Sequence, residues 1–305
     1  MAGLRVICGK VKDSWKFLPL LAVLALCAAC GAGATTAPPA PSGRMSPARL
    51  SDRSFSSKAL NGIDHFQIYL PRGYFSARWR YPVIYLLHGL PGDANSYKTG
   101  RLQSVGQAAQ DSGRPAIVVS PQGAREGDTD PEWLDWGPGR NWATATADGL
   151  VGYVDQHYRT IANRRGRAII GLSAGGYGAT SIGLQHPRTY SVIQSWSGYF
   201  RPTNPSGSAP LDLGSAKANQ RANVHTYVNR IEWIYDHYRP TYFAFYVGDA
   251  DPHFVPANEK LNRELLAAKV PHVYANYPGA HTSGFWDEHE ETWIGAATHE
   301  LTAAH

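Results

Sequence analysis

The segment RAIIGLSAGGYGAT, residues 167–180, leads a short apolar run directly into a cluster of small residues around one serine. The run RAIIGL (167–172) has the length and composition of a buried strand, and the residues that follow are small enough to begin a tightly packed helix. A serine at this junction lies on a sharp turn that presents its hydroxyl away from the backbone. Because such a turn brings the strand and the helix close together, its neighbours must be small. Gly171 and Gly175, on either side of Ser173, meet that requirement.

The pattern G-x-S-x-G between a strand and a helix is typical of a nucleophile elbow. The turn places Ser173 at a helix N-terminus, where free amides and the helix dipole stabilise a developing oxyanion. The amide of Ala174, directly after the serine, is the expected first donor. A glycine-rich helix cap with an incidental serine has the same five letters, so the rest of the chain must supply the partners.

A serine hydroxyl is a weak nucleophile without a base, and in α/β-hydrolase order an acid and then a histidine follow the serine. His281 stands in YPGAHTSGFW (277–286), directly after the last predicted strand, and is the expected base. The acid is expected after the preceding strand, in YVGDADPHF (246–254), where Asp251 is favoured and Asp249 is the alternative. Either aspartate also suits a plain turn before the proline.

A second oxyanion donor is expected in the loop after an early central strand. The segment PVIYLLHGLPGDANSY (82–97) has this character, and the backbone amide of Leu90 is the candidate donor. A simple strand-to-turn transition explains HGLPG (88–92) equally well in isolation.

Two connections between predicted elements are long. The first, 122–142, is rich in Gly, Asp and Trp, and the second, 197–220, is rich in Gly, Pro and Ser. Loops of this length in a compact domain are more often functional than bare connectors. Four aromatic residues of these loops are candidates to line a substrate pocket: Trp133, Trp136, Trp142 and Tyr199. Trp286, five residues after His281, is a fifth candidate. The alternative for the three loop tryptophans is a hydrophobic cluster that fixes the loop.

Strand-like and helix-like segments alternate from about residue 55 onward, and several strands are continuous apolar runs. This alternation predicts an α/β fold with a mostly parallel central sheet and helices on both faces. The predicted strands are 65–70, 82–89, 116–121, 167–172, 191–196, 242–248 and 272–278. The predicted helices are roughly 101–111, 144–159, 174–186, 217–237, 257–268 and 285–304.

The N-terminus has the features of an export signal. Basic residues precede the uncharged run FLPLLAVLALCAA (17–29), which is shorter than the about 20 residues that a transmembrane helix needs. Residues 1–29 are therefore predicted to be a signal peptide, with Cys30 as the lipid-bearing residue if LCAACG is a lipoprotein box. Residues 30–54 are predicted to be a flexible Pro/Ala/Ser-rich linker and residues 55–305 the catalytic domain. Location outside the cell or in its envelope follows from this reading.

Composition excludes several classes of protein. The chain of 305 residues is 43% hydrophobic and 17% charged, as in ordinary globular proteins. Its net charge of +5 falls to +2 without the leader, which gives no footprint for nucleic acid. All three cysteines lie in or beside the leader, so no disulfide is expected in the domain. No cofactor motif is evident, and HEETW (289–293) lacks the paired-histidine spacing of a zinc site.

The chain resembles the esterase-D/antigen-85-like branch of the α/β hydrolases over residues 60–300. Four blocks carry the resemblance: YLLHGLPGDANSY (85–97), RAIIGLSAGGYGATSIGLQHP (167–187), YVGDADPHF (246–254) and YPGAHTSGFW (277–286). The resemblance implies the α/β-hydrolase fold, with Ser173 as nucleophile, His281 as base, Asp251 as acid, and Leu90 and Ala174 as oxyanion donors. Trp286 matches the last position of the family's H-x-x-x-aromatic-W block.

The chain departs from the mycolyltransferases of that branch. Those enzymes usually begin the oxyanion loop with Asp-Gly and use a glutamate as acid, whereas this chain has His88-Gly89 and an aspartate. The resemblance therefore implies a secreted or envelope-anchored serine hydrolase of carboxylic esters that needs no cofactor. Its expected partner is a small-molecule or cell-envelope ester, with the oligomeric state open. The alternatives are an acyltransferase that acts on an envelope sugar and a non-catalytic binding protein of the same fold.

Overall fold

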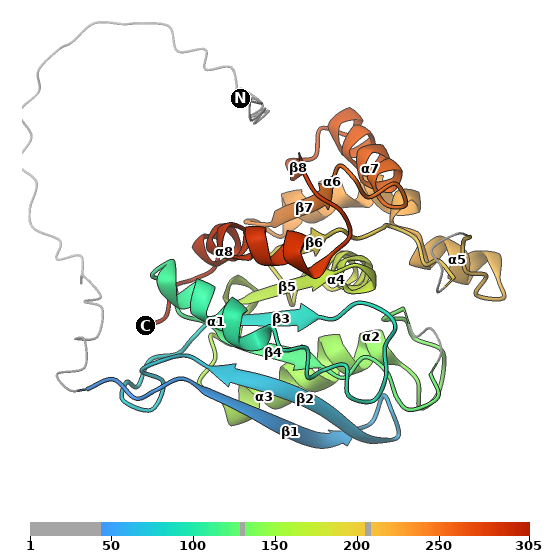
Figure 1. The fold of residues 1–305 in the computed structure, drawn as a ribbon. Helices are drawn as coiled ribbons and strands as arrows, with labels where there is room; N and C mark the ends of the chain where they lie inside the picture. The colour runs from blue at the N-terminus through green and yellow to red at the C-terminus, as the bar shows by residue number, and fades with distance from the viewer. Residues whose placement is uncertain (1–43, 129–131, 205–208) are drawn as a thin grey trace, which may run out of the picture. The chain divides into compact units, whose positions relative to one another are not determined.

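The computed structural model describes residues 44–128, 132–204 and 209–305, and these form an eight-stranded sheet of order β1-β2-β4-β3-β5-β6-β7-β8 (Figure 1). The strands from β4 to β8 in this order are parallel, whereas β1 and β2 are antiparallel at one edge. The strands are β1 (Arg49–Ser57), β2 (Gly62–Leu70), β3 (Val83–Leu87), β4 (Ile117–Pro121), β5 (Arg167–Leu172), β6 (Val192–Trp196), β7 (Tyr242–Gly248) and β8 (Val273–Tyr277). The predicted leader and Cys30 lie outside the described residues.

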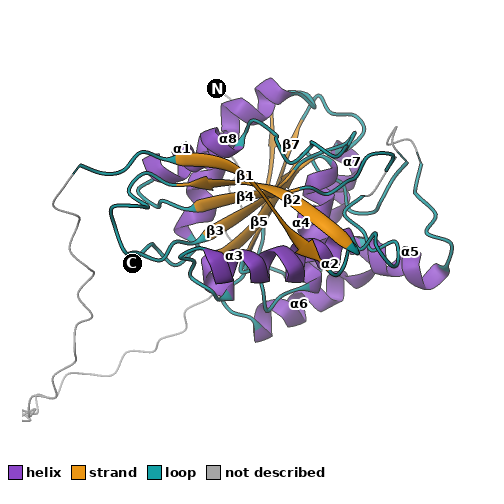
Figure 2. Cartoon of the chain, turned by 90° about the horizontal axis from the view of Figure 1, so that it is seen from below, coloured by secondary structure: helices purple, strands orange, loops and turns teal. Residues whose placement is uncertain are grey.

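Helices cover both faces of this twisted sheet, as Figure 2 shows. The helix α1 packs against α8 on one face, and α4 and α6 contribute to the core of the other. The α-helices are α1 (Leu102–Asp111), α2 (Trp142–Thr144), α3 (Val151–His157), α4 (Ala174–Gln185), α5 (Ala216–Ala222), α6 (Val228–His237), α7 (Val255–Ala267) and α8 (Ser283–His299). A π-helical turn, Ala145–Leu150, joins α2 to α3, and short 3₁₀ turns occupy Arg164–Gly166 and Val224–Tyr227.

Side-chain alternation along the strands divides the core into two layers. In β3, Val83, Tyr85 and Leu87 pack with the layer that includes α3, α4 and α6. Ile84 and Leu86 pack with the layer under α1 and α8. Every residue of β3 is buried, because successive side chains point to opposite faces and both faces are covered. The predicted α/β architecture with a mostly parallel sheet is confirmed.

One strand was not predicted. The strand β1 begins at Arg49, inside the segment 30–54 that the sequence analysis assigned to a linker, so that part of the linker prediction is wrong. Its sequence RLSDRSFSS is polar and most of its side chains are exposed, because β1 is an edge strand that pairs only with β2. An edge strand with few buried side chains lacks the hydrophobic pattern from which strands are predicted.

The helix predicted over 217–237 is interrupted. Helix α5 ends at Ala222, and a 3₁₀ turn precedes α6. The side chain of Asn223 accepts a hydrogen bond from the amide of His225 at 3.1 Å, which begins the new turn. Asparagine competes for backbone hydrogen bonds in this way and favours helix ends over helix interiors.

Two further observations concern the described ranges only. Within them, no helix combines the length and the apolar character needed to span a membrane. Within the same ranges, His, Cys, Asp and Glu side chains do not gather into a group that could hold a metal ion.

Candidate active site

The predicted functional residues lie on turns that follow parallel strands. Ser173 follows β5, Asp251 follows β7 by a short turn, and His281 lies in the loop between β8 and α8. The loop with Leu90 follows β3, which is the neighbour of β5 in the sheet. Because the carboxyl ends of parallel strands meet at one edge, segments far apart in the sequence converge there.

Ser173 has a backbone conformation that few residues with a side chain adopt, φ 56° and ψ −123°. It lies directly before α4, and its amide donates to the carbonyl of Trp196 at 2.9 Å. A Cβ atom on Gly171 would overlap the carbonyl oxygen of Gly175, and one on Gly175 would overlap that of Leu87. The two glycines therefore let β5 and α4 approach as closely as the sequence pattern predicts.

The structure brings Ser173, His281 and Asp251 into one hydrogen-bonded line. His281 Nε2 lies 3.0 Å from Ser173 Oγ, and His281 Nδ1 lies 2.7 Å from Asp251 Oδ2. Asp251 is only 2% exposed, which shields its contact with the imidazole from water. The amide of Phe254 also donates to Asp251 Oδ1, at 3.3 Å.

Asp249, the alternative acid, has a different role. Its Oδ1 accepts a hydrogen bond from the amide of Gly279 at 3.0 Å, and the residue is exposed. It therefore ties the turn after β7 to the loop that carries His281. The open choice between the two aspartates is thus decided by geometry, because Asp251 is the one that faces His281.

The oxyanion side of the site is formed by the β3 loop and the start of α4. A Cβ atom on Gly89 would lie 3.1 Å from Cβ of Ser173, so this loop runs directly beside the serine. Leu90 follows Gly89, and its side chain packs against a small cluster that contains Ala174. Within the described part of the chain, neither the Leu90 amide nor the Ala174 amide donates a hydrogen bond. Both amides are therefore available to an oxyanion bound at Ser173.

Two aromatic rings flank the imidazole of His281. The ring of Phe254 lies 4.9 Å from it, and the ring of Trp286 lies 5.1 Å away in an edge-to-face arrangement. The indole of Trp286 is fixed by its hydrogen bond to Ser197 Oγ at 3.1 Å. These rings restrict the orientations of the imidazole. Trp286 was a candidate from the sequence, whereas Phe254 was missed, although it stands three residues after Asp251.

Of the remaining aromatic candidates, Tyr199 packs in the cluster that contains Ala174 and Leu90, whereas the three loop tryptophans have other positions. Trp142 is 1% exposed and packs with Leu60 and Ala145, so its predicted contact with substrate is wrong. Trp133 is also buried, and its Nε1 donates to the carbonyl of His88 at 3.2 Å. Both rings fix the first long loop, which was the stated alternative.

Tyr199 and Trp136 have other positions. Tyr199 is buried between the rings of Tyr177 and Phe254, and its hydroxyl donates to the carboxylate of Glu132 at 2.7 Å. Glu132 is fully buried, and the amide of Thr203 also donates to it at 3.4 Å. It was not predicted, because no motif marks a carboxylate whose donors come from a distant loop. Trp136 is half-buried and lines a separate cavity.

His88 supports the site indirectly. Its ring nitrogens each lie 2.8 Å from a carbonyl oxygen, of Gly89 and of Gln122, and its ring packs against Trp133. Burial lowers the pKa of His88 below its ordinary value, and the contacts with these two carbonyl groups oppose this effect. This histidine therefore holds the oxyanion loop in place.

A cavity of about 390 Å³ opens beside the elbow, next to Gly89 and Leu172. Trp286, Leu86, Leu87 and Pro91 form the apolar part of its wall. Polar side chains also line it: His88, Asp93, Asn95, Ser96, Lys98, Thr99, Arg101 and Ser283. Arg101 is held by Asp287 at 2.7 Å and Glu290 at 3.2 Å, which ties α1 to α8 behind this wall. The cavity is of a size that small-molecule sites commonly have.

Residues 57–290 match the family model described as "Putative esterase". The chain belongs to this esterase family. The chain is 28% identical to Esterase Rv1288 of Mycobacterium tuberculosis, over 74% of this chain and 54% of that protein. It thus spans about half the length of the curated relatives it matches.

Solved structures confirm the fold of this chain. A ferulic acid esterase superposes with a TM-score of 0.68 at 23% identity, over 83% of this chain and 99% of the other. The S-formylglutathione hydrolase of Agrobacterium tumefaciens gives a TM-score of 0.67 at 19% identity, over 84% and 96%. The predicted α/β-hydrolase fold and the predicted family branch are both confirmed.

Proposed function

We propose that this protein hydrolyses carboxylic esters through an acyl-enzyme on Ser173. The observation that carries the proposal is the continuous line from Ser173 Oγ to His281 and from His281 to the buried Asp251. A nucleophile, a base within hydrogen-bond reach and a third group that orients the base are the components that acyl transfer needs. Their position beside two free amides supplies the fourth component.

The first half of the proposed reaction forms the acyl-enzyme. His281 Nε2 accepts the hydroxyl proton as Ser173 Oγ bonds to the ester carbonyl carbon, and the carbonyl oxygen becomes an oxyanion between the amides of Leu90 and Ala174. Asp251 accepts the hydrogen bond of Nδ1–H and stabilises the imidazolium. His281 then gives its proton to the departing alkoxide, and the C–O bond to the alcohol breaks.

The second half returns the enzyme to its starting state. Water loses a proton to His281 and adds to the acyl carbon, and the proton passes to Ser173 as the free acid leaves. We propose that the cavity beside Gly89 and Leu172 takes the part of the ester on one side of the bond that breaks. Transfer to a sugar hydroxyl is the alternative, and it would give an acylated sugar in place of the acid.

The test is hydrolysis of p-nitrophenyl acetate by the full chain and by Ser173→Ala, with release of acetate measured beside that of nitrophenol. We expect kcat to fall about 10⁶-fold, as for other nucleophilic serines. Ser51→Ala, on the edge strand β1, is the control and keeps full activity. Retained hydrolysis by a folded Ser173→Ala protein would falsify the proposal.

Export belongs to the proposal and rests on the leader in the sequence alone. We propose that the mature esterase lacks residues 1–29 and works outside the cytoplasm or on the envelope. The intact mass of the protein from its native host tests this step, because an uncleaved chain of 305 residues would contradict it.

A further inference from the structure

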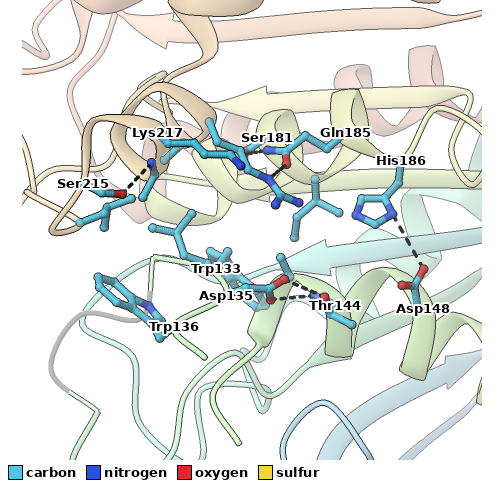
Figure 3. Close-up of a pocket in the computed structure, with 17 residues that line it drawn as sticks. Trp133, Asp135, Trp136, Thr144, Asp148, Ser181, Gln185, His186, Ser215 and Lys217 are labelled. Carbon is cyan, nitrogen blue, oxygen red and sulfur yellow. Dashed lines mark hydrogen bonds and ion pairs between the residues drawn. The ribbon is translucent and has the colours of Figure 1, made fainter. Parts of the chain in front are cut away.

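A second cavity, of about 610 Å³, lies apart from the reacting groups (Figure 3). Its lining includes none of the residues of the hydrogen-bonded line, and it is larger than the cavity beside the elbow. The first long loop and the π-helical turn form one wall, and the second half of α4 with α5 forms the other. Leu134 separates the two regions, because it lines this cavity and also packs in the cluster with Ala174.

The two walls carry opposite charges, as Figure 3 shows. Asp135 and Asp148 lie on the wall of the loop and the π-helical turn, and Lys217 and Arg221 lie on α5. Within the described residues, neither carboxylate forms an ion pair with either cation. Among the described lining residues, two carboxylates therefore balance two cations, and these acceptors and cationic donors face each other across the space.

Neutral polar groups complete this arrangement. Gln185 accepts from Arg221 Nε at 3.2 Å and donates to Ser181 at 2.9 Å. Thr144 donates its hydroxyl to Asp135 at 2.7 Å. His186 also lines the cavity, with its Nδ1 3.8 Å from Asp148 Oδ1, and burial lowers the pKa of this ring. Hydrogen-bonding groups of both kinds are thus fixed around the cavity before any ligand enters.

The opposed charges of the two walls favour a ligand without net charge. An anion that fills the cavity meets the two carboxylates, and a cation meets Lys217 and Arg221. A neutral molecule with many hydroxyl groups avoids both penalties, since each hydroxyl donates to a carboxylate or accepts from a cation. Such charge-assisted hydrogen bonds are stronger than neutral ones.

An aromatic side chain adds a preference for sugar rings. Trp136 lines the cavity and is half-buried, with Leu60, Trp142 and Ala145 packed against it. A tryptophan presents a large apolar surface, and the C–H face of a sugar ring is the apolar side of a molecule that is otherwise hydroxylated. The cavity volume lies within the about 300–1,000 Å³ typical of small-molecule sites.

We propose that the cavity between Trp136 and α5 binds a neutral oligosaccharide at a site separate from the reacting serine. Ser173 has no part in this binding. The site therefore holds a glycan whether or not the proposed ester chemistry is correct.

Calorimetric titration of the full-length Ser173→Ala protein tests the proposal, with xylotriose and maltotriose as neutral probes. Tri-galacturonic acid and the glucosamine trimer are the charged probes. We expect at least one neutral trisaccharide to bind, and the charged trimers to bind about tenfold more weakly. Absence of saturable binding by both neutral sugars, or tighter binding of a charged trimer, overturns the proposal.

Three variants locate the site. Trp136→Ala removes the aromatic surface and weakens binding about tenfold. Ala218→Trp fills the cavity from α5 and blocks binding without removing a contact group. Trp233→Ala, on the exposed face of α6, is the matched control and leaves binding unchanged. Placed in the protein that retains Ser173, the first two leave p-nitrophenyl acetate hydrolysis unchanged, and equal binding by all three overturns the location.

Discussion

The backbone of Ser173 is strained, and contacts with neighbouring residues hold it in that conformation. A side chain at φ 56° costs about 1–3 kcal/mol of backbone strain, and the surrounding structure must hold it there. The hydrogen bond of its amide to Trp196 and the absence of a Cβ atom on Gly171 and Gly175 fix the turn. The hydroxyl is thereby held 3.0 Å from His281.

Substitution of the two aspartates after β7 is expected to have different effects on activity. In Asp251→Asn the residue can no longer hold the imidazole in the required tautomer or stabilise its charge, so kcat should fall about 10⁴-fold. Activity on p-nitrophenyl acetate and the folded state by circular dichroism are the measurements. Asp249→Asn is the matched control, because its amide oxygen still accepts from Gly279, and it should stay within about twofold of the parent. The opposite ranking of the two variants would reverse the assignment of the acid.

At the scale of elements, the contact between β5 and α4 sets the geometry of the site. Gly175 belongs to the first turn of α4 and lies against the carbonyl groups at the end of β3. Helix α4 is buried along almost its whole length, so it cannot move away without disturbing both the sheet and the α6 side of the core. Close packing of this kind makes small changes in volume costly.

Gly175→Ala is therefore expected to destabilise the fold by about 1–3 kcal/mol and to reduce esterase activity by displacing the elbow. Urea unfolding and p-nitrophenyl acetate hydrolysis measure the two effects. Gly152→Ala in α3 is the control, because a Cβ atom there meets nothing within 4 Å. Alanine favours a helix over glycine, so this variant should gain about 0.5–1 kcal/mol. A Gly175→Ala protein with parental stability and activity would disprove the steric account of the elbow.

At the scale of the whole molecule, one buried carboxylate makes stability depend on pH. Burial raises the pKa of Asp64 in β2 to about 7, and the charge of Arg125 offsets part of this effect. The folded protein thus keeps a proton that the unfolded chain releases near pH 4. Because the folded state binds more protons between about pH 4 and 7, the free energy of unfolding falls as the pH rises through this window. Above pH 7 the full penalty is present.

Asp64→Asn is expected to reduce the pH dependence of the free energy of unfolding. This variant cannot ionise, so its stability should fall less between pH 5 and pH 8 than that of the parent, by a difference on the order of a few kcal/mol. Urea unfolding at both pH values is the measurement. Asp236→Asn, in an exposed pair with Arg239, is the control and should change stability by less than about 1 kcal/mol at either pH. Equal pH dependence in the parent and in Asp64→Asn would show that the buried carboxylate does not control stability.

Local patterns were enough to predict the strands of the sheet core and the strand-to-helix turn that carries Ser173. The apolar runs of β3, β5 and β7 have the composition of buried strands. The small residues around Ser173 are those that a tight strand-to-helix turn requires. His281 was predicted as the base because it follows the serine and the candidate acids along the chain. The strand β1 escaped prediction because an edge strand with exposed side chains has no apolar signal.

Tertiary structure alone decided what depends on contacts between distant segments. Asp249 and Asp251 have the same local sequence setting, and only the position of the β8 loop shows which one reaches His281. The aromatic candidates also look alike in sequence, yet Trp142 is packed in a core cluster and Trp136 lines the second cavity. The sequence by itself determined the fold class and indicated Ser173 and His281, since the strands and the turn at Ser173 are specified by neighbours along the chain and His281 by its order after them. The burial of Glu132, the roles of the tryptophans and the cavity of opposed charges arise only when the long loops meet α4 and α5 in space.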